Sequence, residues 1–312
     1  MEFFRVNTHI DFMGKRGLMA GVLIVLIAIS LGSLLTQGLT LGLDFSGGTL
    51  IEVSYDAPID LKKVRDALGK GGFPEAVVQD YGSSRDIMVR IAPRTGQDSA
   101  ELSTHVLETL QQASTGKVEM REVEYVGALV GNELIEQGGL AMLYALIGIF
   151  IYVMLRFEWR FSLGALLSTV HDTIFTFGFF SLFRIEFDLT VLASVLTVIG
   201  YSLNDTIVVF DRIRENFRRM RKGAVVDVMN ASINQTLSRT IMTSGTTMLV
   251  VLSLFFLGGP VVHGFALALI VGILIGTVSS IYVASPLALW LGVTRANLAP
   301  VKRQDTGRDD VP

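Results

Sequence analysis

The chain has 312 residues, of which 50% are hydrophobic and 18% are charged, and its mean hydropathy is +0.52. This composition is too apolar for an ordinary soluble domain and indicates a membrane protein. The sequence has no cysteine, which excludes disulfides, thiol catalysis and cysteine-based metal sites. It has no GxxxxGK[ST] phosphate loop, its four histidines lack metal-ligand spacing, and its net charge of −3 does not point to nucleic acid. We therefore expect no cofactor, no bound metal, no nucleic-acid partner and no direct use of ATP.

Six apolar stretches are long enough to be membrane-spanning helices, which need about 20 mainly apolar residues. They cover residues 18–36, 139–155, 161–183, 189–210, 241–257 and 264–290. The first follows Lys15 and Arg16 and so resembles a signal peptide. No small-x-small cleavage site follows it, and we interpret it as an uncleaved anchor.

The basic residues predict the orientation of the chain in the membrane. They gather before the first stretch, between the second and third, between the fourth and fifth, and in the C-terminal tail. If successive helices cross the membrane in alternating directions, these four segments fall on one side. The positive-inside rule predicts that this side is cytoplasmic. The N-terminal segment 1–17 and the tail 292–312 are then both cytoplasmic, and the expected location is the inner (cytoplasmic) membrane.

Residues 37–138, between the first two stretches, form the predicted external domain. Alternating and helical apolar patterns predict six elements in this segment. These are strand 49–55, helix 58–69, strands 76–80 and 86–91, helix 99–113 and strand 118–126. The order βαββαβ is typical of a ferredoxin-like α+β domain. The predicted fold class is thus a polytopic α-helical membrane protein whose residues 139–291 hold helices two to six.

A basic cluster opens the connection between the fourth and fifth stretches, at residues 212–238. Beyond it, Val226, Met229, Ile233 and Leu237 recur at helical spacing. This pattern favours an amphipathic helix lying on the cytoplasmic membrane surface. The alternative is a soluble helix packed on the ends of the spanning helices.

Asp205 is the most informative residue, because it lies with Asn204 in a stretch that is otherwise apolar enough to cross a bilayer. A carboxylate at bilayer depth costs roughly 2.5–3.5 kcal/mol and is rare there without a partner or a task. Ser194, Ser202 and Asp205 share one helical face, which suits the interior of a bundle. The primary interpretation is a proton or ion site, and the alternative is a structural hydrogen-bond anchor.

Arg239 is the natural basic partner of Asp205. It stands just before the fifth stretch, at a depth similar to that of Asp205 if the two helices run in opposite directions. An ionised Asp205 would attract Arg239 and a protonated one would release it, which makes a proton switch. The alternative for Arg239 is an arginine that extends its side chain from a helix end to the membrane surface.

Other polar residues within the apolar stretches are candidates for a supporting role. Thr243, Ser244 and Thr247 could line a hydrated path, or could simply let helices pack closely. His171 and Asp172 form a second polar insertion, and a histidine titrates near neutral pH. The alternative is that this pair has a structural role, with its polar groups hydrogen-bonded to neighbouring helices.

Paired glycines mark both ends of the external domain. Gly47 and Gly48 precede its first strand, and Gly127 and Gly131 follow its last. Tight turns are the usual reason for such glycines. We predict a turn at the first pair and a hinge into the second spanning helix at the other.

Six stretches resemble the SecF-type subunits of the SecD/SecF family of protein-export membrane proteins. They are LDFSGGT (43–49), YVG (125–127), VGNEL (130–134), VHD (170–172), IGYSLNDTIVVFDRIREN (199–216) and NQTLSRTIMTS (234–244). They occur in order over nearly the whole chain, and the stretch ending at Asn216 is highly specific. One departure is Ala128, where the family pattern has proline.

The resemblance implies half of a transporter of the resistance-nodulation-division superfamily, without enzyme activity. A SecD-like subunit would supply the other half, and the pair would use the proton motive force to help preproteins leave the SecYEG channel. Asp205 and Arg239 match the intramembrane Asp and Arg of the family. The implied partners are the SecD-like subunit, SecYEG, YajC, the preprotein and the lipid bilayer. A standalone transporter half for lipids or drugs and a passive channel scaffold remain the alternatives.

Overall fold

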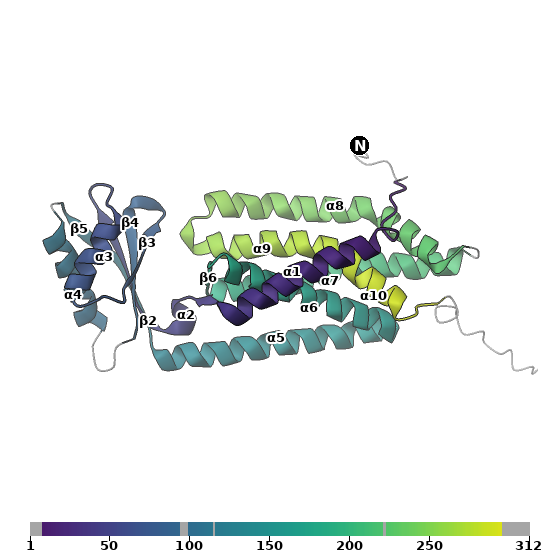
Figure 1. The fold of residues 1–312 in the computed structure, drawn as a ribbon, viewed down its shortest axis with the longest axis horizontal. Helices are drawn as coiled ribbons and strands as arrows, with labels where there is room; N and C mark the ends of the chain where they lie inside the picture. Colours follow the sequence, from purple (N-terminus) through teal and green to yellow (C-terminus); the bar gives the residue numbers. More distant parts are fainter. Residues whose placement is uncertain (1–7, 94–98, 115, 221–222, 295–312) are drawn as a thin grey trace, which may run out of the picture.

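The computed structural model describes residues 8–93, 99–114, 116–220 and 223–294. The molecule is elongated, with a small α/β domain at one end and a long helical bundle at the other (Figure 1). The predicted cytoplasmic segments 1–17 and 292–312 include residues 1–7 and 295–312, which lie outside the described residues.

Six helical segments among the described residues are long and apolar enough to cross a membrane, as the six apolar stretches predict. They are α1 (Arg16–Thr36), α5 (Ala128–Arg156), α6 (Trp159–Leu182), α7 (Leu189–Arg219), α8 (Val225–Leu257) and the last segment, in which α9 (Pro260–Ser279) continues through the π-helical turn η1 (Ser280–Ala284) into α10 (Ser285–Trp290).

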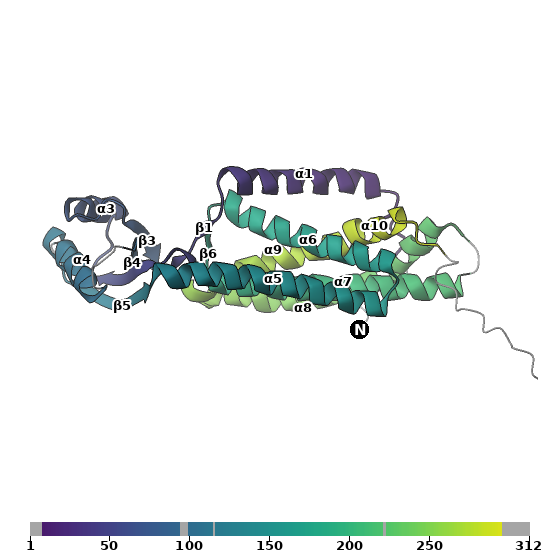
Figure 2. The same cartoon turned by 90° about the horizontal axis from the view of Figure 1, so that it is seen from below.

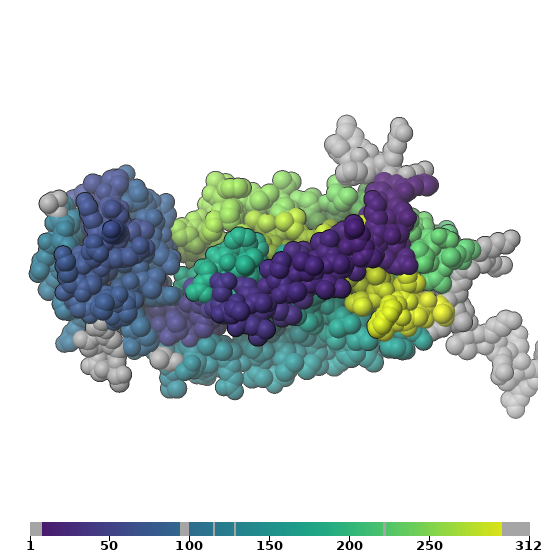
Figure 3. Space-filling model, viewed as in Figure 1, coloured from purple at the N-terminus to yellow at the C-terminus, as the bar shows by residue number. Residues whose placement is uncertain are grey.

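Helix α7 is the centre of the bundle, because α6, α8 and α9 all pack against it. Helix α1 lies along α6 as an outer layer and covers the surface of the bundle obliquely (Figures 2 and 3). Helices α1, α5 and α8 bury little of their apolar surface inside the chain. These three helices therefore face lipid or another protein.

The segment 212–238 does not form the predicted surface helix. Instead, α7 extends to Arg219 and α8 already begins at Val225, so the segment belongs to two long helices. Val228, Met229 and Ile233 are buried in a hydrophobic cluster with side chains from α6 and α7. The predicted apolar stripe is present, but side chains of the protein cover it. This agrees with the alternative interpretation, in which the segment packs on the ends of the spanning helices.

The domain between α1 and α5 has the predicted order of two helices and four strands. Its elements are β2 (Gly48–Tyr55), α3 (Leu61–Lys70), β3 (Val77–Tyr81), β4 (Ser83–Ile91), α4 (Ser99–Ala113) and β5 (Val118–Val126). The antiparallel sheet has the order β3-β4-β2-β5. This is the split βαβ arrangement of a ferredoxin-like domain. Both helices contribute to one core with the sheet, built around Ile51, Leu68 and Val106.

Two boundaries in this domain differ from the prediction for local reasons. Helix α3 begins at Leu61 rather than at Pro58, because the Asp60 side chain caps it by accepting a hydrogen bond from the Lys62 amide. Gly82 alone connects β3 to β4, and its φ of 76° favours glycine. Both strands therefore extend further toward the turn than predicted.

The junction between the domain and the bundle contains three short elements that the patterns do not predict. Helix α2 (Leu43–Ser46) precedes β2, and β1 (Thr40–Leu41) pairs in parallel with β6 (Glu186–Phe187). Strand β6 lies between α6 and α7, so this pairing brings the start of the domain to the start of α7.

Candidate functional site

The Asp205 side chain lies inside the bundle, as its helical face predicts. It is 2% exposed, and it accepts a hydrogen bond on Oδ2 from the Ser244 hydroxyl of α8 at 3.3 Å. The Ser244 hydroxyl also lies 3.0 Å from Thr277 Oγ1 of α9. A single buried carboxylate is thereby connected, through hydroxyl groups, to α8 and α9, two of the helices that pack against α7.

Arg239 lies on α8, the helix that also supplies Ser244, and its side chain is exposed. Among the described residues it forms no ion pair within 4.0 Å with Asp205, although its charge acts on that carboxyl. Asn204 is exposed on the other side of α7. The structure thus places Arg239 near Asp205 without contact and turns Asn204 away from it.

The hydroxyls predicted to support Asp205 divide into two kinds. Ser244 reaches the carboxyl, whereas Thr243 and Thr247 donate to backbone carbonyls of their own helix, at Arg239 and Thr243, over 3.0 and 2.9 Å. A threonine hydroxyl that bonds to the backbone of its own helix is compatible with a membrane helix and needs no further role. Ser244 is the supporting residue that the geometry brings to the site.

His171 and Asp172 form a second buried polar cluster, centred on α6. Asp172 is 1% exposed, and its Oδ1 lies 2.9 Å from Nδ1 of His171. Ser202 of α7 and Ser279 of α9 donate to its Oδ2 at 2.5 and 2.7 Å. This cluster and the Asp205 cluster both connect α7 to α9, one helical turn apart on α7.

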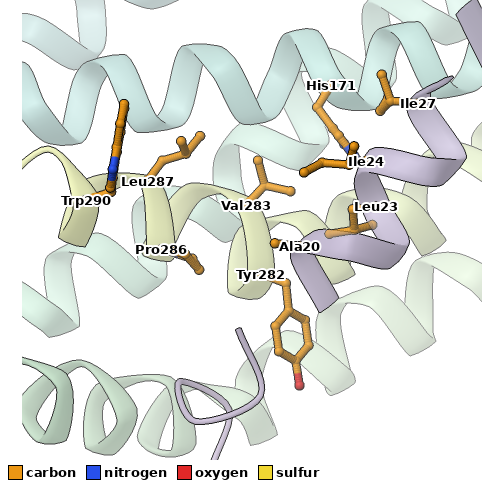
Figure 4. A pocket seen from close by; sticks show the side chains of 10 residues that line it. All are labelled: Ala20, Leu23, Ile24, Ile27, His171, Tyr282, Val283, Pro286, Leu287 and Trp290. Carbon is orange, nitrogen blue, oxygen red and sulfur yellow. The ribbon is translucent and has the colours of Figure 1, made fainter. Parts of the chain in front are cut away.

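A cavity of about 420 Å³ lies beside this second cluster, between α1, α6, η1 and α10. Its walls are mostly apolar, and His171 lies on one of them (Figure 4). Tyr282 also borders the cavity, but its hydroxyl points away from the other lining side chains (Figure 4). The described residues contain no group of three histidine or acidic side chains able to hold a metal ion.

The four glycines differ in what the backbone requires of them. Gly47 and Gly48 have φ values of 66° and 123°, and a Cβ on Gly48 would lie 2.3 Å from the Ile91 carbonyl oxygen. Gly127 precedes the first residue of α5 in an extended conformation. A Cβ on Gly131 would lie 2.6 Å from the Phe45 carbonyl oxygen. The first pair shapes a turn, and Gly131 lets α5 pack against α2, while the hinge role stays a prediction.

Asp44 has a role that its sequence context does not reveal. Its Oδ2 accepts a hydrogen bond from the Leu189 amide at 2.9 Å, at the first residue of α7. Asp188 caps the same helix end by accepting from the Val191 amide at 2.7 Å. The short segment before β2 is therefore attached to the helix that carries Asp205. The only signal for Asp44 in the sequence is its position before the paired glycines, and this position does not predict a contact with the start of α7.

A second connection between domain and bundle uses Arg90 of β4. Its Nη1 donates to Glu186 Oε1 at 2.8 Å and to the Leu41 carbonyl at 2.9 Å. Neither Arg90 nor Glu186 stands out in the sequence, because each lies in an ordinary strand or loop context. The three residues join the sheet domain, β1 and β6 at one place.

Two family models match the chain. The model described as "Protein export membrane protein SecD/SecF, C-terminal" covers residues 105–294, and the model described as "SecD/SecF GG Motif" covers residues 32–59. The second match includes Asp44, Gly47 and Gly48, the segment attached to α7.

The chain is also similar to curated proteins over most of its length. It is 53% identical over 291 residues to the "Protein translocase subunit SecF" of Vibrio alginolyticus, covering 93% of this chain and 92% of that protein. It is 51% identical over 301 residues to the protein of that name from Pseudomonas aeruginosa, covering 96% and 97%.

Solved structures share the same architecture. The crystal structure of SecDF from Thermus thermophilus superposes with a TM-score of 0.83 at 38% identity. A SecDF structure described as the super-membrane-facing form superposes with a TM-score of 0.70 at the same identity. Each match covers 93% of this chain but 39% of the SecDF chain, so this chain corresponds to part of a longer protein there. The family, the identities and the six apolar helices place the chain among the multi-pass membrane proteins of the SecD/SecF protein-export family.

Proposed function

We propose that this chain is an accessory subunit of the Sec protein translocase that, with a SecD-like partner, uses the proton motive force to promote preprotein translocation and release outside the membrane. Its similarity to translocase SecF subunits over most of the chain supports the translocase role. The SecDF structures, in which the matching part belongs to a longer chain, support the SecD-like partner. No enzyme activity is part of the proposal.

The observation that carries the proton-driven part is the buried Asp205 with Arg239 nearby but out of contact. An ionised carboxylate at this depth attracts the Arg239 guanidinium, and a protonated one leaves it free. In the described geometry the charged atoms of the two side chains are more than 4.0 Å apart, as expected for the separated arrangement. One charge crossing 100 mV supplies about 2.3 kcal/mol, enough to shift the balance between two conformations.

Helix α7 offers a route from this switch to the external domain. Asp205 lies roughly 24 Å along the helix from Leu189, at a rise of about 1.5 Å per residue. At that far end, the Asp44 side chain attaches the helix to the segment that leads into β2. A shift of α7 would therefore be passed directly to the base of the sheet domain.

The exposed face of α7 suits a SecD-like partner. Small and polar residues recur there at helical spacing, at Ala193, Thr197, Gly200 and Asn204. Small residues allow close approach of membrane helices, and an amide such as that of Asn204 is costly against lipid. A helix of the partner packed on this face would cover Asn204. SecYEG, YajC and the preprotein are the further partners in this proposal.

The proposed orientation has both termini in the cytoplasm and the sheet domain outside the inner membrane. The positions of the basic residues support it. Arg156 ends α5, Arg160 lies in the first turn of α6, and the cluster at 212–219 ends α7. These helix ends lie at the end of the bundle away from the sheet domain (Figure 1). Asp205 is then nearer the cytoplasmic side than the outer side.

Reconstitution tests the proposal. The chain, its SecD-like partner and SecYEG are placed in vesicles, and proton conduction and preprotein release are measured with Asp205→Asn and with Thr246→Val as a matched control. Thr246 is exposed on α8 and bonds its own backbone, so its variant should match the wild type. Asp205→Asn should abolish proton conduction and the gradient-dependent release.

The other outcomes identify the alternatives. If Asp205→Asn leaves conduction and release unchanged, the proton switch is wrong and a passive scaffold is favoured. If the chain conducts protons but never copurifies with a SecD-like protein or SecYEG, a standalone transporter half is favoured.

A further inference from the structure

Asp172 is a buried carboxyl that the Asp205 switch does not use. It is 1% exposed, its Oδ2 accepts hydrogen bonds from Ser202 and Ser279, and its Oδ1 lies within hydrogen-bond distance of His171 Nδ1. Ser279 also accepts a bond from Ser168 at 3.2 Å. A single carboxyl thus joins α6, α7 and α9 at their common contact.

No fixed positive charge balances this carboxyl within the described part of the chain. No lysine or arginine there lies within 4.0 Å of it, and His171 is its ionisable contact. The elements packed against α6 bring Asp205 of α7 and Tyr282 of η1 to nearby turns. The charged and histidine side chains of α1, α5 and α9 lie toward helix ends, at Arg16, Glu133, Glu136, Arg156 and His263, and α5 also carries Tyr144 and Tyr152. A carboxylate buried without a permanent cation is costly, and a shared proton removes that cost.

His171 connects Asp172 with the cavity. Its Nδ1 contacts Asp172, while its Nε2 is buried and has no hydrogen-bond partner among the described residues. The imidazole lies on the wall of the cavity bounded by α1, η1 and α10 (Figure 4). Since the hydroxyl of Tyr282 points away, His171 is the polar side chain through which a proton from the cavity side would reach Asp172.

We propose that Asp172 is a second proton-binding carboxyl of this chain, loaded through His171 and separate from Asp205. This inference rests on the proposed proton-driven function. A proton from water binds His171 Nε2 and gives an imidazolium. The Nδ1 proton then passes to Asp172 Oδ1, which leaves a neutral imidazole with its proton on Nε2 and a neutral carboxylic acid. The reverse steps return the proton, and no other reactant is needed.

Proton binding at Asp172 changes how the three helices are joined. After loading, the acid donates from Oδ1 to His171 Nδ1, so this bond reverses its direction within α6. Loss of the negative charge weakens the bonds that Ser202 of α7 and Ser279 of α9 donate to Oδ2, because hydrogen bonds to a charged acceptor are stronger than those to a neutral one. The helices have little spare room, because a Cβ on Gly276 would lie 3.1 Å from Ser202 Cβ. The π-helical turn η1 begins directly after Ser279, and such turns are frequent at functional sites. Loading of Asp172 would therefore alter the α6–α7–α9 contact.

Infrared difference spectroscopy during a pH titration tests this directly. The full chain with its SecD-like partner is held in lipid membranes, and the carbonyl stretch of protonated carboxyl groups is followed. We expect Asp172→Asn to remove one titrating band that Asp205→Asn retains. His171→Asn keeps an amide donor for Oδ1 but does not titrate, so it should shift the pH at which this band appears. Thr173→Val is the matched control, since the buried Thr173 hydroxyl bonds its own helix.

The functional readout separates proton binding from a structural role. Asparagine preserves the size of Asp172 and its ability to accept hydroxyl bonds, so a purely structural hub predicts near wild-type preprotein release in Asp172→Asn. Proton binding predicts a loss of at least about tenfold, which corresponds to 1.4 kcal/mol. Should Asp172→Asn fail to fold, Ser279→Ala keeps the carboxyl, removes one donor and should shift the same band.

Two results would overturn the inference: a spectrum in which Asp172→Asn loses no titrating band, or a Ser279→Ala spectrum identical to the wild type. The proposed function fails separately, if wild-type vesicles conduct no protons or Asp205→Asn behaves as wild type. A titrating Asp172 band in such vesicles would still establish the second proton-binding site.

Discussion

Ser244 is the residue that connects Asp205 to the helices around it. Its hydroxyl contacts Asp205 on α7 and Thr277 on α9, from a position on α8. The sequence predicts the buried carboxyl well, because a lone Asp in an apolar stretch has to face the bundle. It does not predict which hydroxyl contacts the carboxyl. Thr243, Ser244 and Thr247 are all candidates, and the rotation of α8 about its own axis decides which of them faces Asp205 on α7.

Ser244→Ala should therefore weaken the function of Asp205 without removing it. A hydrogen bond to a charged group contributes about 1.5–3 kcal/mol, and at 3.3 Å this one belongs at the lower end. We expect proton-driven preprotein release to fall roughly tenfold, measured in the reconstituted vesicles. Ser253→Ala, which removes an exposed hydroxyl bonded to its own helix, is the control and should have no effect. Equal rates in both variants would show that Ser244 only fills space.

Glu186 should make the stability of the domain–bundle junction depend on pH. Burial raises the pKa of the Glu186 carboxyl, and the guanidinium of Arg90 opposes this shift. Because the folded pKa is raised, the protonated form favours folding. Its contribution is complete below the ordinary carboxyl pKa and is lost as the pH rises through the raised value. Glu186→Gln keeps an acceptor for Arg90 and removes this dependence.

Thermal unfolding in detergent at several pH values measures the effect. Relative to Glu186→Gln, the wild type should lose stability between acidic and neutral pH. A relative gain over the same range would show that attraction by Arg90 outweighs the cost of burial.

At the scale of elements, the long helices follow from the sequence better than their surroundings do. The apolar stretches locate all six spanning helices, but they give no reason for α7 to continue to Arg219 or for α8 to begin at Val225. An amphipathic pattern shows which face is apolar and not what covers it, which is why the predicted surface helix is wrong. Elements α2, β1 and β6 are too short to carry a pattern, and contacts distant in sequence hold them.

Gly131→Ala tests the packing of α5 on α2. The added Cβ would meet the Phe45 carbonyl oxygen at 2.6 Å, and this backbone atom cannot move aside as a side chain can. We expect a loss of about 1–3 kcal/mol in the free energy of unfolding, measured by denaturation in detergent. Gly139→Ala on the same helix has open space around it and should be neutral or slightly stabilising. Similar losses in both variants would contradict a close α2–α5 contact.

At the scale of the whole molecule, the proposed function requires that Asp205 and the sheet domain move together. The domain joins the bundle through the α2–β2 and β5–α5 connections, the bond from Leu189 to Asp44 and the ion pair of Arg90 with Glu186. The sequence predicts the domain and the bundle separately. It does not predict these attachments, since each pairs residues far apart in the chain.

The distance between two spin labels, one on the sheet domain and one on the bundle, measures this coupling. The chain has no cysteine, so Lys63→Cys on α3 and Val261→Cys at the end of α9 nearer the sheet domain provide two exposed labelling sites without further changes. The labelled chain is reconstituted with its SecD-like partner in vesicles with and without a proton gradient. We predict that the gradient changes the distance distribution in the otherwise wild-type chain and leaves it unchanged when Asp205→Asn is added. A distribution that ignores the gradient, or that responds equally with Asp205→Asn, would contradict the coupling of Asp205 to the external domain.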